Sequence, residues 1–401
     1  MSDSQQRPLE GYRVLDLATM IAAPLCAGIL GEFGAEVIKI EMPGKGDALR
    51  SFGTMNASGS SFNWLNEGRN KKSITLDVRT GQGLDIFKRL VATSDVVVEN
   101  FRPGTLEKWG LGYDVLKAIK EDIILVRVSA YGQDGPYRNR PGYARVAHGF
   151  AGLTHLAGEP DGRPVVPGST ALADYISGVY AAVGALLSLI ARDRFHVGQA
   201  VDVALYEGIF RFLDELAPVY HATGYVRDRM GADTVNAAPH SHYQTKNGKW
   251  VALACSSDKM WERLCKVMDR MDLAAPEAFA FVDQRMARKD EVNRIVQDWM
   301  SSHSYEQVMA LCLEGDVPLG PINTIADIFE DEQFGARGNL LRVEAPRVGE
   351  VVVPNVVPRL SRTPGEVRSL GPELGQHNEE IYGQLGIGPE ALRQLRESKV
   401  I

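Results

Sequence analysis

Short apolar runs typical of buried strands alternate with helical segments along the first half of the chain. The first such unit is a strand over residues 12–17, a helix over 22–34 and a second strand over 36–40. Helical periodicity at 83–92 and 113–119 separates three further strand-like runs, which lie at 73–78, 95–99 and 123–128. Strands that alternate with helices predict an α/β domain built on a largely parallel, doubly wound sheet.

The rest of the chain is predicted to add a second, smaller domain. A chain of 401 residues is longer than one hydrophobic core usually fills. A long helix from Asp174 to Arg192 and a strand over 200–205 complete the large, Rossmann-like α/β domain, which we place at 1–224. Composition changes after Gly224, so we place a small domain at 225–321 and a C-terminal part at 322–401.

Charge and hydropathy argue against several classes of protein. A net charge of −7 with 44 basic residues argues against a nucleic-acid-binding protein. The N-terminus lacks a secretory pattern, and no run approaches the roughly 18 apolar residues that a membrane span needs. The cysteines show neither metal nor disulfide spacing, which fits a reduced cytoplasmic compartment. They are Cys26, Cys255, Cys265 and Cys312.

Several common catalytic motifs are missing from the sequence. A dinucleotide site needs glycines directly after the first strand, whereas residues 18–24 contain none, so we expect no nicotinamide cofactor. There is no P-loop motif and no Gly-x-Ser-x-Gly. His240 and His242 alternate along the chain, but two ligands without a third do not make a metal site, so we expect no metal.

Asp174 opens the long helix directly after the small and polar run 168–173, and it has two interpretations. The first is a helix N-cap, a position where aspartate is favoured. The second is a nucleophile, since a carboxylate can attack an acyl carbon and form an anhydride. Ala173, Ser177 and Gly178 would leave room for a thioester to approach. The local sequence does not decide between the two.

Basic residues cluster at 69–72, 99–108 and 138–140. Each cluster alone is typical of a solvated surface. Ligands of open α/β sheets bind at the carboxyl ends of the strands. Together, at the ends of adjacent strands, these clusters could hold a polyanionic nucleotide such as coenzyme A.

Separated motifs along nearly the whole chain resemble the family III CoA-transferases. They include Leu30-Gly-Glu-Phe-Gly-Ala-Glu-Val-Ile-Lys-Ile-Glu41, Val98-Glu-Asn-Phe-Arg-Pro-Gly104, Ser129-Ala-Tyr-Gly-Gln-Asp-Gly-Pro136 and Leu374-Gly-Gln-His377. The resemblance implies an interlocked dimer of ring-like chains, each with a large domain made from both termini and a small domain between. It implies acyl-CoA and a carboxylic acid as substrates, with coenzyme A as part of the substrate and no permanently bound cofactor.

The resemblance places Asp174 on the family's nucleophilic aspartate. It also places a set of residues on positions that line the CoA site, with the first two on a turn near the thioester. These are Ile21, Ala22, Leu76, Arg79, Asn100, Phe101, Arg102 and Lys108.

The sequence departs from the formyl-CoA transferase pattern. Ile21 replaces a glutamine, Met42 replaces an arginine, and residues 237–243 replace a glycine-rich loop. The resemblance is closer to members that use succinyl-CoA as donor and a dicarboxylic or hydroxydicarboxylic acid as acceptor. Our candidates for holding the acceptor are Tyr143, Arg138, Arg140, His240 and His242.

Two alternatives remain open. An α-methylacyl-CoA racemase shares this fold but needs a histidine opposite the aspartate, where this chain has Tyr143. His148 and His155 are nearby in sequence, but neither is in register. The other alternative is that this chain is one subunit of a heteromeric CoA-transferase, which consists of two related chains instead of two identical ones.

Overall fold

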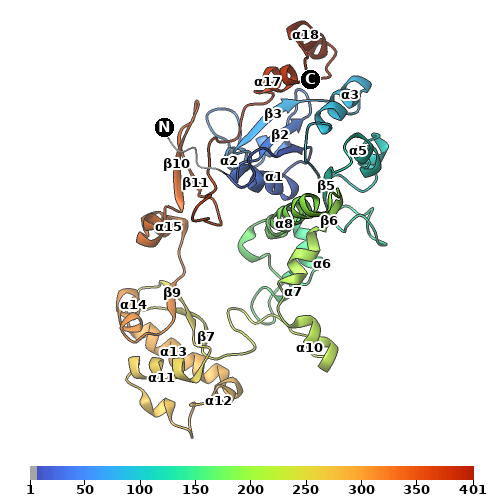
Figure 1. Cartoon of the computed structure of the whole chain (residues 1–401). Helices are drawn as coiled ribbons and strands as arrows, with labels where there is room; N and C mark the ends of the chain where they lie inside the picture. Colours follow the sequence, from blue (N-terminus) through green and yellow to red (C-terminus); the bar gives the residue numbers. More distant parts are fainter. Residues whose placement is uncertain (1–6) are drawn as a thin grey trace. The chain divides into compact units, whose positions relative to one another are not determined.

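The structure, a computed structural model, describes residues 7–401 and divides into two compact units (Figure 1). The first unit holds the chain up to Thr154, Val166–Gly224 and Ala336–Ile401. The second holds His155–Val165 and Tyr225–Gly335. Sequence composition had suggested that the small domain covers residues 225–321. The second unit of the structure also includes the short segment His155–Val165.

A six-stranded sheet forms the centre of the first unit, and all five of its strand pairings are parallel. The strands are β1 (Arg13–Asp16), β2 (Glu36–Glu41), β3 (Lys71–Thr75), β4 (Val96–Glu99), β5 (Ile124–Ser129) and β6 (Ala200–Ala204). Their order, β3-β2-β1-β4-β5-β6, is that of a doubly wound fold, and its direction of winding reverses between β1 and β4. The predicted parallel α/β sheet is confirmed.

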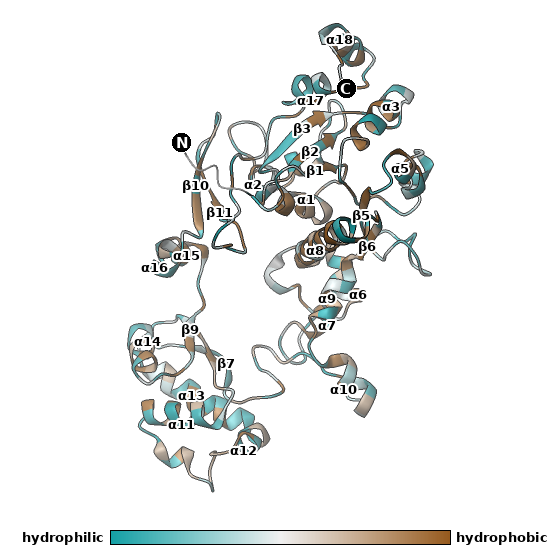
Figure 2. Cartoon of the chain, in the orientation of Figure 1, coloured by the Kyte–Doolittle hydropathy of each residue, from teal (hydrophilic) through white to brown (hydrophobic). Residues whose placement is uncertain are grey.

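Helices cover both faces of this sheet, and apolar residues of its strands are buried against both helical layers (Figures 1 and 2). One face packs against α1 (Ala22–Glu32), α6 (Ala144–Phe150), α8 (Leu172–Phe195) and α9 (Leu205–Arg211). The other packs against α3 (Gly81–Val91), α4 (Thr105–Lys108), α5 (Tyr113–Ile119), α17 (Asn378–Gln384) and α18 (Pro389–Glu397). The C-terminal residues Val400 and Ile401 are buried in this second layer.

Helix α8 packs closely against α1 through small residues. A Cβ added at Gly178 would lie 2.6 Å from the carbonyl oxygen of Ala22 and 2.8 Å from Leu25. By length and composition alone α8 could cross a membrane, and it is the one such helix among residues 7–401. This corrects the expectation that no segment reaches that length. Because α8 packs on the sheet and on α1, it is a core helix of this unit.

The remaining elements of the first unit lie around this core. They are α2 (Phe62–Glu67), α10 (Leu216–Thr223), the short 3-10 turns η1 (Ala48–Ser51) and η2 (Pro167–Ser169), and the antiparallel pair β10 (Leu340–Ala345) and β11 (Gly349–Pro354). Two helices cross a boundary between the units along the chain, α7 (Leu153–Leu156) and α16 (Glu332–Ala336).

The second unit has an antiparallel sheet of its own and a separate core centred on Trp261. Its strands are β7 (His240–Gln244), β8 (Trp250–Ala254) and β9 (Leu319–Pro321). Its helices are α11 (Asp258–Val267), η3 (Met271–Ala274), α12 (Val282–Ala287), α13 (Lys289–Ser302), α14 (Tyr305–Glu314) and α15 (Ile325–Glu330).

We predict that Gly178→Ala destabilises the protein, because the added methyl group overlaps the backbone of α1. Overpacking of this kind costs about 1–3 kcal/mol of unfolding free energy, measured by urea-induced unfolding. Gly383→Ala is the control, since Gly383 of α17 has open space around its Cβ position and alanine favours helix. Equal stability of the two variants would contradict the close α1–α8 contact.

Candidate functional site

The turn between β1 and α1 lies at the reversal point of the sheet, and side chains from two other loops hold it in place. Met20 has a left-handed backbone conformation with φ of 66°. Its N–H donates to Asp47 Oδ1 at 3.0 Å. Asn100, which follows β4, accepts from the Thr19 N–H at 2.9 Å and donates to the Thr19 carbonyl at 2.7 Å. Asn100 therefore positions this turn, in addition to its predicted place in the CoA site.

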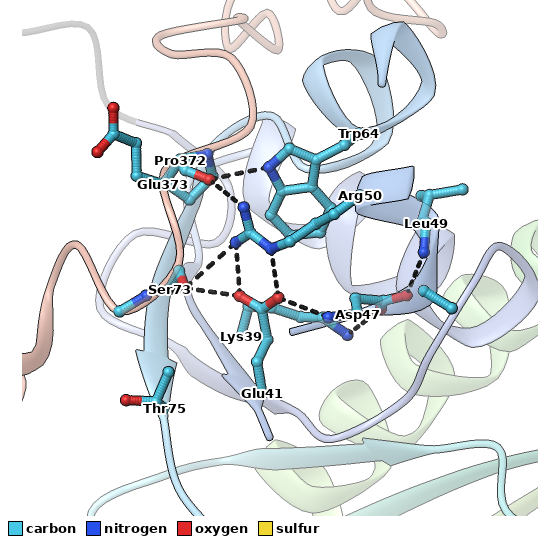
Figure 3. A network of polar contacts seen from close by, with 12 residues as sticks. Lys39, Glu41, Asp47, Leu49, Arg50, Trp64, Ser73, Thr75, Pro372 and Glu373 are labelled. Atoms are coloured by element: carbon cyan, nitrogen blue, oxygen red, sulfur yellow. Dashed lines mark hydrogen bonds and ion pairs between the residues drawn. The ribbon is translucent and has the colours of Figure 1, made fainter. Parts of the chain in front are cut away.

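A buried cluster of charges supports the same turn, and Figure 3 shows two of its members, Lys39 and Asp47. Lys39 Nζ lies 2.9 Å from Asp47 Oδ2 and 3.5 Å from Asp16 Oδ1, and it also donates to the Ala18 carbonyl. Lys71 Nζ lies 2.9 Å from Asp16 Oδ2. All four charged side chains are almost completely buried, so each depends on its partners.

The pKa values of Lys39 and Asp47 are both shifted towards the charged forms of these groups. Burial alone would lower the pKa of Lys39, but the carboxylates of Asp16, Asp47 and Glu41 outweigh burial and hold this pKa above its usual value. Burial would likewise raise the pKa of Asp47, yet Lys39 and two backbone N–H groups hold it below its usual value. Lys39 and Asp47 therefore stay charged at physiological pH and hold the turn as an ion pair.

Glu41, at the end of β2, anchors the loop that follows it (Figure 3). Arg50 binds both oxygens of the Glu41 carboxylate at 2.7 Å, and its guanidinium lies 3.8 Å from the centre of the Trp64 ring. Arg50 Nη1 and Trp64 Nε1 both donate to the Pro372 carbonyl, at 2.9 and 2.8 Å. The C-terminal segment therefore helps to fix the loop over residues 42–51.

A cavity of about 160 Å³ opens beside this loop, at the carboxyl ends of β1, β2 and β3. It contains three residues that the sequence assigned to coenzyme A, namely Leu76, Arg79 and Phe101. Phe101 and Trp109 form an edge-to-face pair with centroids 4.9 Å apart. The other lining residues are Leu17, Thr19, Lys39, Ile40, Glu41, Met42, Gly46, Asp47 and Val78. Its size and apolar walls suit one flat ring of a larger ligand.

Basic side chains near this cavity differ in whether a carboxylate of the chain already binds them. Arg79 makes two 2.8 Å hydrogen bonds to the carboxylate of Asp77. Arg102 and Lys108 are exposed, and neither forms an ion pair within residues 7–401. These two charges are therefore available to an anionic ligand.

The structure corrects the N-cap interpretation of Asp174. Helix α8 begins at Leu172, its N-cap residue is Ala171, and Asp174 is the third residue of the helix. The Asp174 carboxylate makes no hydrogen bond or ion pair within the described part of the chain. Burial raises its pKa to about 6, and no charged neighbour contributes to this shift. A desolvated carboxylate without partners is a stronger base and a better nucleophile than one in water.

The first turns of α8 and α1 lie against one another. Ile21 is buried together with Leu49 and Trp64, and Ala171 and Tyr175 pack against this group. No side chain caps the first turn of α1, which follows Ile21. Its free N–H groups, including that of the predicted site residue Ala22, thus lie near the helix turn that carries Asp174.

His148 of α6 is a residue that sequence reasoning assigned no role. Its side chain is completely buried, and its Nε2 accepts the Ala173 N–H at 2.9 Å, directly before Asp174. Its Nδ1 is buried without a hydrogen-bond partner in the described region. Burial and the nearby Arg145 lower the pKa of His148. No spacing signal in the sequence connects His148 to α8.

The candidates for acceptor binding lie in both units. Tyr143 is 76% exposed at the start of α6, and Arg138 is exposed in the preceding loop. The Arg140 guanidinium lies over the Tyr137 ring at 3.5 Å. In the second unit, β7 carries His240 and His242 on the same face of the strand, because side chains two residues apart point the same way. Their role stays a prediction.

A larger cavity of about 790 Å³ lies between α2 and the C-terminal segment of the first unit. It contains Arg50, Lys71, Arg368 and His377, but neither Asp174 nor any of the predicted CoA residues. Both basic groups Arg50 and Lys71 are already paired with carboxylates. The smaller cavity, which contains three of the predicted CoA residues, is therefore the better candidate for binding coenzyme A.

Residues 9–378 match the family model described as CoA-transferase family III. The chain belongs to this family. It is 50% identical to the alpha subunit of succinyl-CoA–L-malate CoA-transferase from Chloroflexus aurantiacus, over 99% of this chain and 93% of that protein. It is 51% identical to the beta subunit of that enzyme, over 98% of each chain. The chain is therefore a CoA-transferase.

A solved structure shows the same fold. The crystal structure of a CaiB/BaiF family protein from Brucella suis superposes with a TM-score of 0.84 at 34% identity, covering 95% of this chain and all of the other. The expected family and the α/β fold are confirmed. The interlocked dimer and the individual CoA-transferase site residues stay predictions.

We predict that the rate of the first half-reaction of this CoA-transferase follows the ionisation of a group with a pKa of about 6, the value that burial gives Asp174. If Asp174 is the nucleophile, as the resemblance implies, only its carboxylate form can attack. Its raised pKa means that this form is present above pH 6 and lost below it. The first half-reaction should therefore be about tenfold slower at pH 5 than at pH 8. Single-turnover rates with an acyl-CoA measure this, and a midpoint near pH 4 would contradict it.

Proposed function

We propose that this chain transfers coenzyme A from succinyl-CoA to a dicarboxylic or hydroxydicarboxylic acid, with Asp174 as the covalent nucleophile. The observation that carries the proposal is the unpartnered, desolvated carboxylate of Asp174 at the first turn of α8. The two relatives named for succinyl-CoA and L-malate, each about half identical over nearly the whole chain, support this donor and acceptor class.

The proposed reaction begins when a carboxylate oxygen of Asp174 attacks the thioester carbonyl carbon. The carbon–sulfur bond breaks, CoA thiolate leaves, and a mixed anhydride joins Asp174 to the acyl group. The thiolate then attacks the Asp174 acyl carbon, which releases succinate and leaves an aspartyl-CoA thioester. Splitting one transfer into such steps lowers each barrier.

The second half of the reaction reverses these steps with a new acid. The acceptor carboxylate attacks the aspartyl-CoA thioester and displaces the thiolate, which forms a second anhydride. The thiolate attacks the acceptor's acyl carbon, and Asp174 leaves as a carboxylate. No net proton, ATP or metal is required, so we propose that the enzyme works with coenzyme A as substrate and without a resident cofactor.

The protein's contribution to these steps is position and charge stabilisation. Arg102 and Lys108 would bind the phosphates of coenzyme A, while the cavity that contains Leu76 and Phe101 would take its adenine ring. The free N–H groups at the start of α1, at Ala22 and Ala23, would donate to the oxyanion that each attack creates. Tyr143, Arg138, Arg140, His240 and His242 remain the candidates for the acceptor's second carboxylate.

A second copy of the chain is proposed to cover an exposed apolar stripe on α8. The stripe consists of Val179, Val183, Leu187 and Ile190, which are 44% to 60% exposed and lie on one side of the helix. A contiguous apolar face of this kind marks a protein interface. We propose that this interface is the homodimer, because the chain is as similar to the alpha as to the beta subunit of one heteromeric enzyme.

The four cysteines of this chain are free and buried, so we propose that the enzyme works in the reducing cytoplasm. Their burial raises the pKa of each thiol, for example to about 12 in Cys255 and Cys265. None of them is therefore a candidate nucleophile that could compete with Asp174.

We predict that the purified chain, collected as one gel-filtration peak, converts succinyl-CoA and a dicarboxylic acid into succinate and a new acyl-CoA without ATP. A panel of malate, citramalate, itaconate, glutarate and benzylsuccinate identifies the acceptor by mass spectrometry of the CoA products. Asp174→Ala should abolish transfer, because it removes the nucleophile. Asp193→Ala is the control, as Asp193 lies at the other end of α8 and is exposed.

Full transfer by Asp174→Ala would overturn the covalent role of Asp174. A chain that is inactive alone but becomes active with a related second chain would replace the homodimer by the heteromeric alternative. Exchange of the α-proton of a branched acyl-CoA, without transfer to any acid, would favour the racemase alternative.

A further inference from the structure

The first turn of α8 lacks the usual side-chain cap. A helix N-terminus leaves four backbone N–H groups without an intrahelical acceptor, and a Ser, Thr, Asp or Asn at the N-cap commonly accepts one of them. Here the N-cap residue is Ala171, whose methyl side chain cannot accept a hydrogen bond. The acceptor comes instead from another helix, because His148 Nε2 of α6 takes the Ala173 N–H at 2.9 Å.

This arrangement affects the residue that follows. A carboxylate in the first turn of a helix is itself a natural acceptor for free N–H groups there. Such bonds would stabilise the charged form of Asp174, lower its pKa and weaken it as a nucleophile. The observed Asp174 carboxylate makes none within residues 7–401, while the neighbouring N–H is already bound to His148.

The hydrogen bond also fixes the state of the imidazole ring. Nε2 can accept only when it carries no proton, so the ring is neutral and its proton is on Nδ1. Nδ1 is buried and has no partner in the described part of the chain. A buried N–H without a partner costs folding free energy, which an apolar residue would avoid at this position. The histidine is thus poorly explained by packing alone.

We propose that His148 is a positioning residue for the transfer reaction, because its Nε2 occupies the Ala173 N–H and keeps the Asp174 carboxylate free to attack the thioester. The inference rests on the proposed role of Asp174. His148 itself touches no reacting atom in this account. It differs from a racemase base, because its available nitrogen is used to hold the backbone of α8.

The test compares two substitutions that differ in their ability to accept a hydrogen bond. His148→Gln places an amide oxygen near the position of Nε2, whereas His148→Leu fills the space without an acceptor. The readout is the rate at which hydroxylamine captures Asp174 as a hydroxamate after mixing with succinyl-CoA, followed by peptide mass spectrometry. Misplacement of a reacting group should slow capture roughly 10- to 100-fold in the leucine variant.

The glutamine variant should recover most of the rate, to within about threefold of the natural protein, because the acceptor is restored. The KM for succinyl-CoA should change less than about twofold in both, since the proposed CoA contacts are elsewhere. Ser188→Ala controls for simple destabilisation of α8, because it removes a hydrogen bond to Gln199 far from the first turn. Its capture rate should equal that of the natural protein.

Equal rates for the leucine and glutamine variants, or a leucine variant as fast as the natural protein, would overturn the role of His148. If the leucine variant does not fold, His148→Asn replaces it, because its shorter amide does not reach the Ala173 N–H and should be slow. An asparagine variant as fast as the glutamine variant would also overturn the role. A natural protein that forms no Asp174 hydroxamate would instead contradict the proposed function.

Discussion

The close packing of α8 against α1 is the constraint on which the site depends. Gly178 leaves no room for a side chain above the Ala22 carbonyl, so the two helices approach at their first turns. Both helices begin at the carboxyl edge of the parallel sheet, since each connects one strand to the next. The contact therefore brings the helix turn that carries Asp174 near the uncapped first turn of α1, as the proposed attack and its proposed oxyanion donor require.

Buried charge, rather than glycine, shapes the turn that leads into α1. Asp16, Lys39, Lys71 and Asp47 form a cluster that is almost inaccessible to solvent, and Asn100 adds two hydrogen bonds from the other side of the reversal point. A dinucleotide-binding fold uses glycines at this turn so that a pyrophosphate can approach. Here the rigid turn instead presents the first N–H groups of α1 towards the helix turn that carries Asp174.

The sequence was sufficient for the parallel fold, for a physical reason. The nucleophilic role of Asp174 came from the resemblance to the family alone and stays a prediction. Apolar runs with a period of two or 3.6 residues report burial directly, so the parallel sheet was predicted correctly. The lysine in the middle of the apolar run 36–40 was a readable sign of a buried partner, which proved to be Asp16 and Asp47. The N-cap interpretation of Asp174 was wrong because α8 begins earlier, at Leu172. The hydrogen bond between His148 and the Ala173 N–H was unreadable, because it depends on where α6 and α8 meet.

The central claim is that Asp174 exchanges an oxygen atom with its substrates. When an acceptor acid labelled with ¹⁸O in its carboxylate passes through the proposed anhydride, the bridging oxygen remains on Asp174 after the thiolate takes the acyl group. Peptide mass spectrometry after turnover with succinyl-CoA should therefore show a gain of about 2 Da on the Asp174 peptide, rising towards about 4 Da when both carboxylate oxygens have exchanged, with the label on that side chain. Complete turnover with an unlabelled Asp174 peptide would contradict the covalent account.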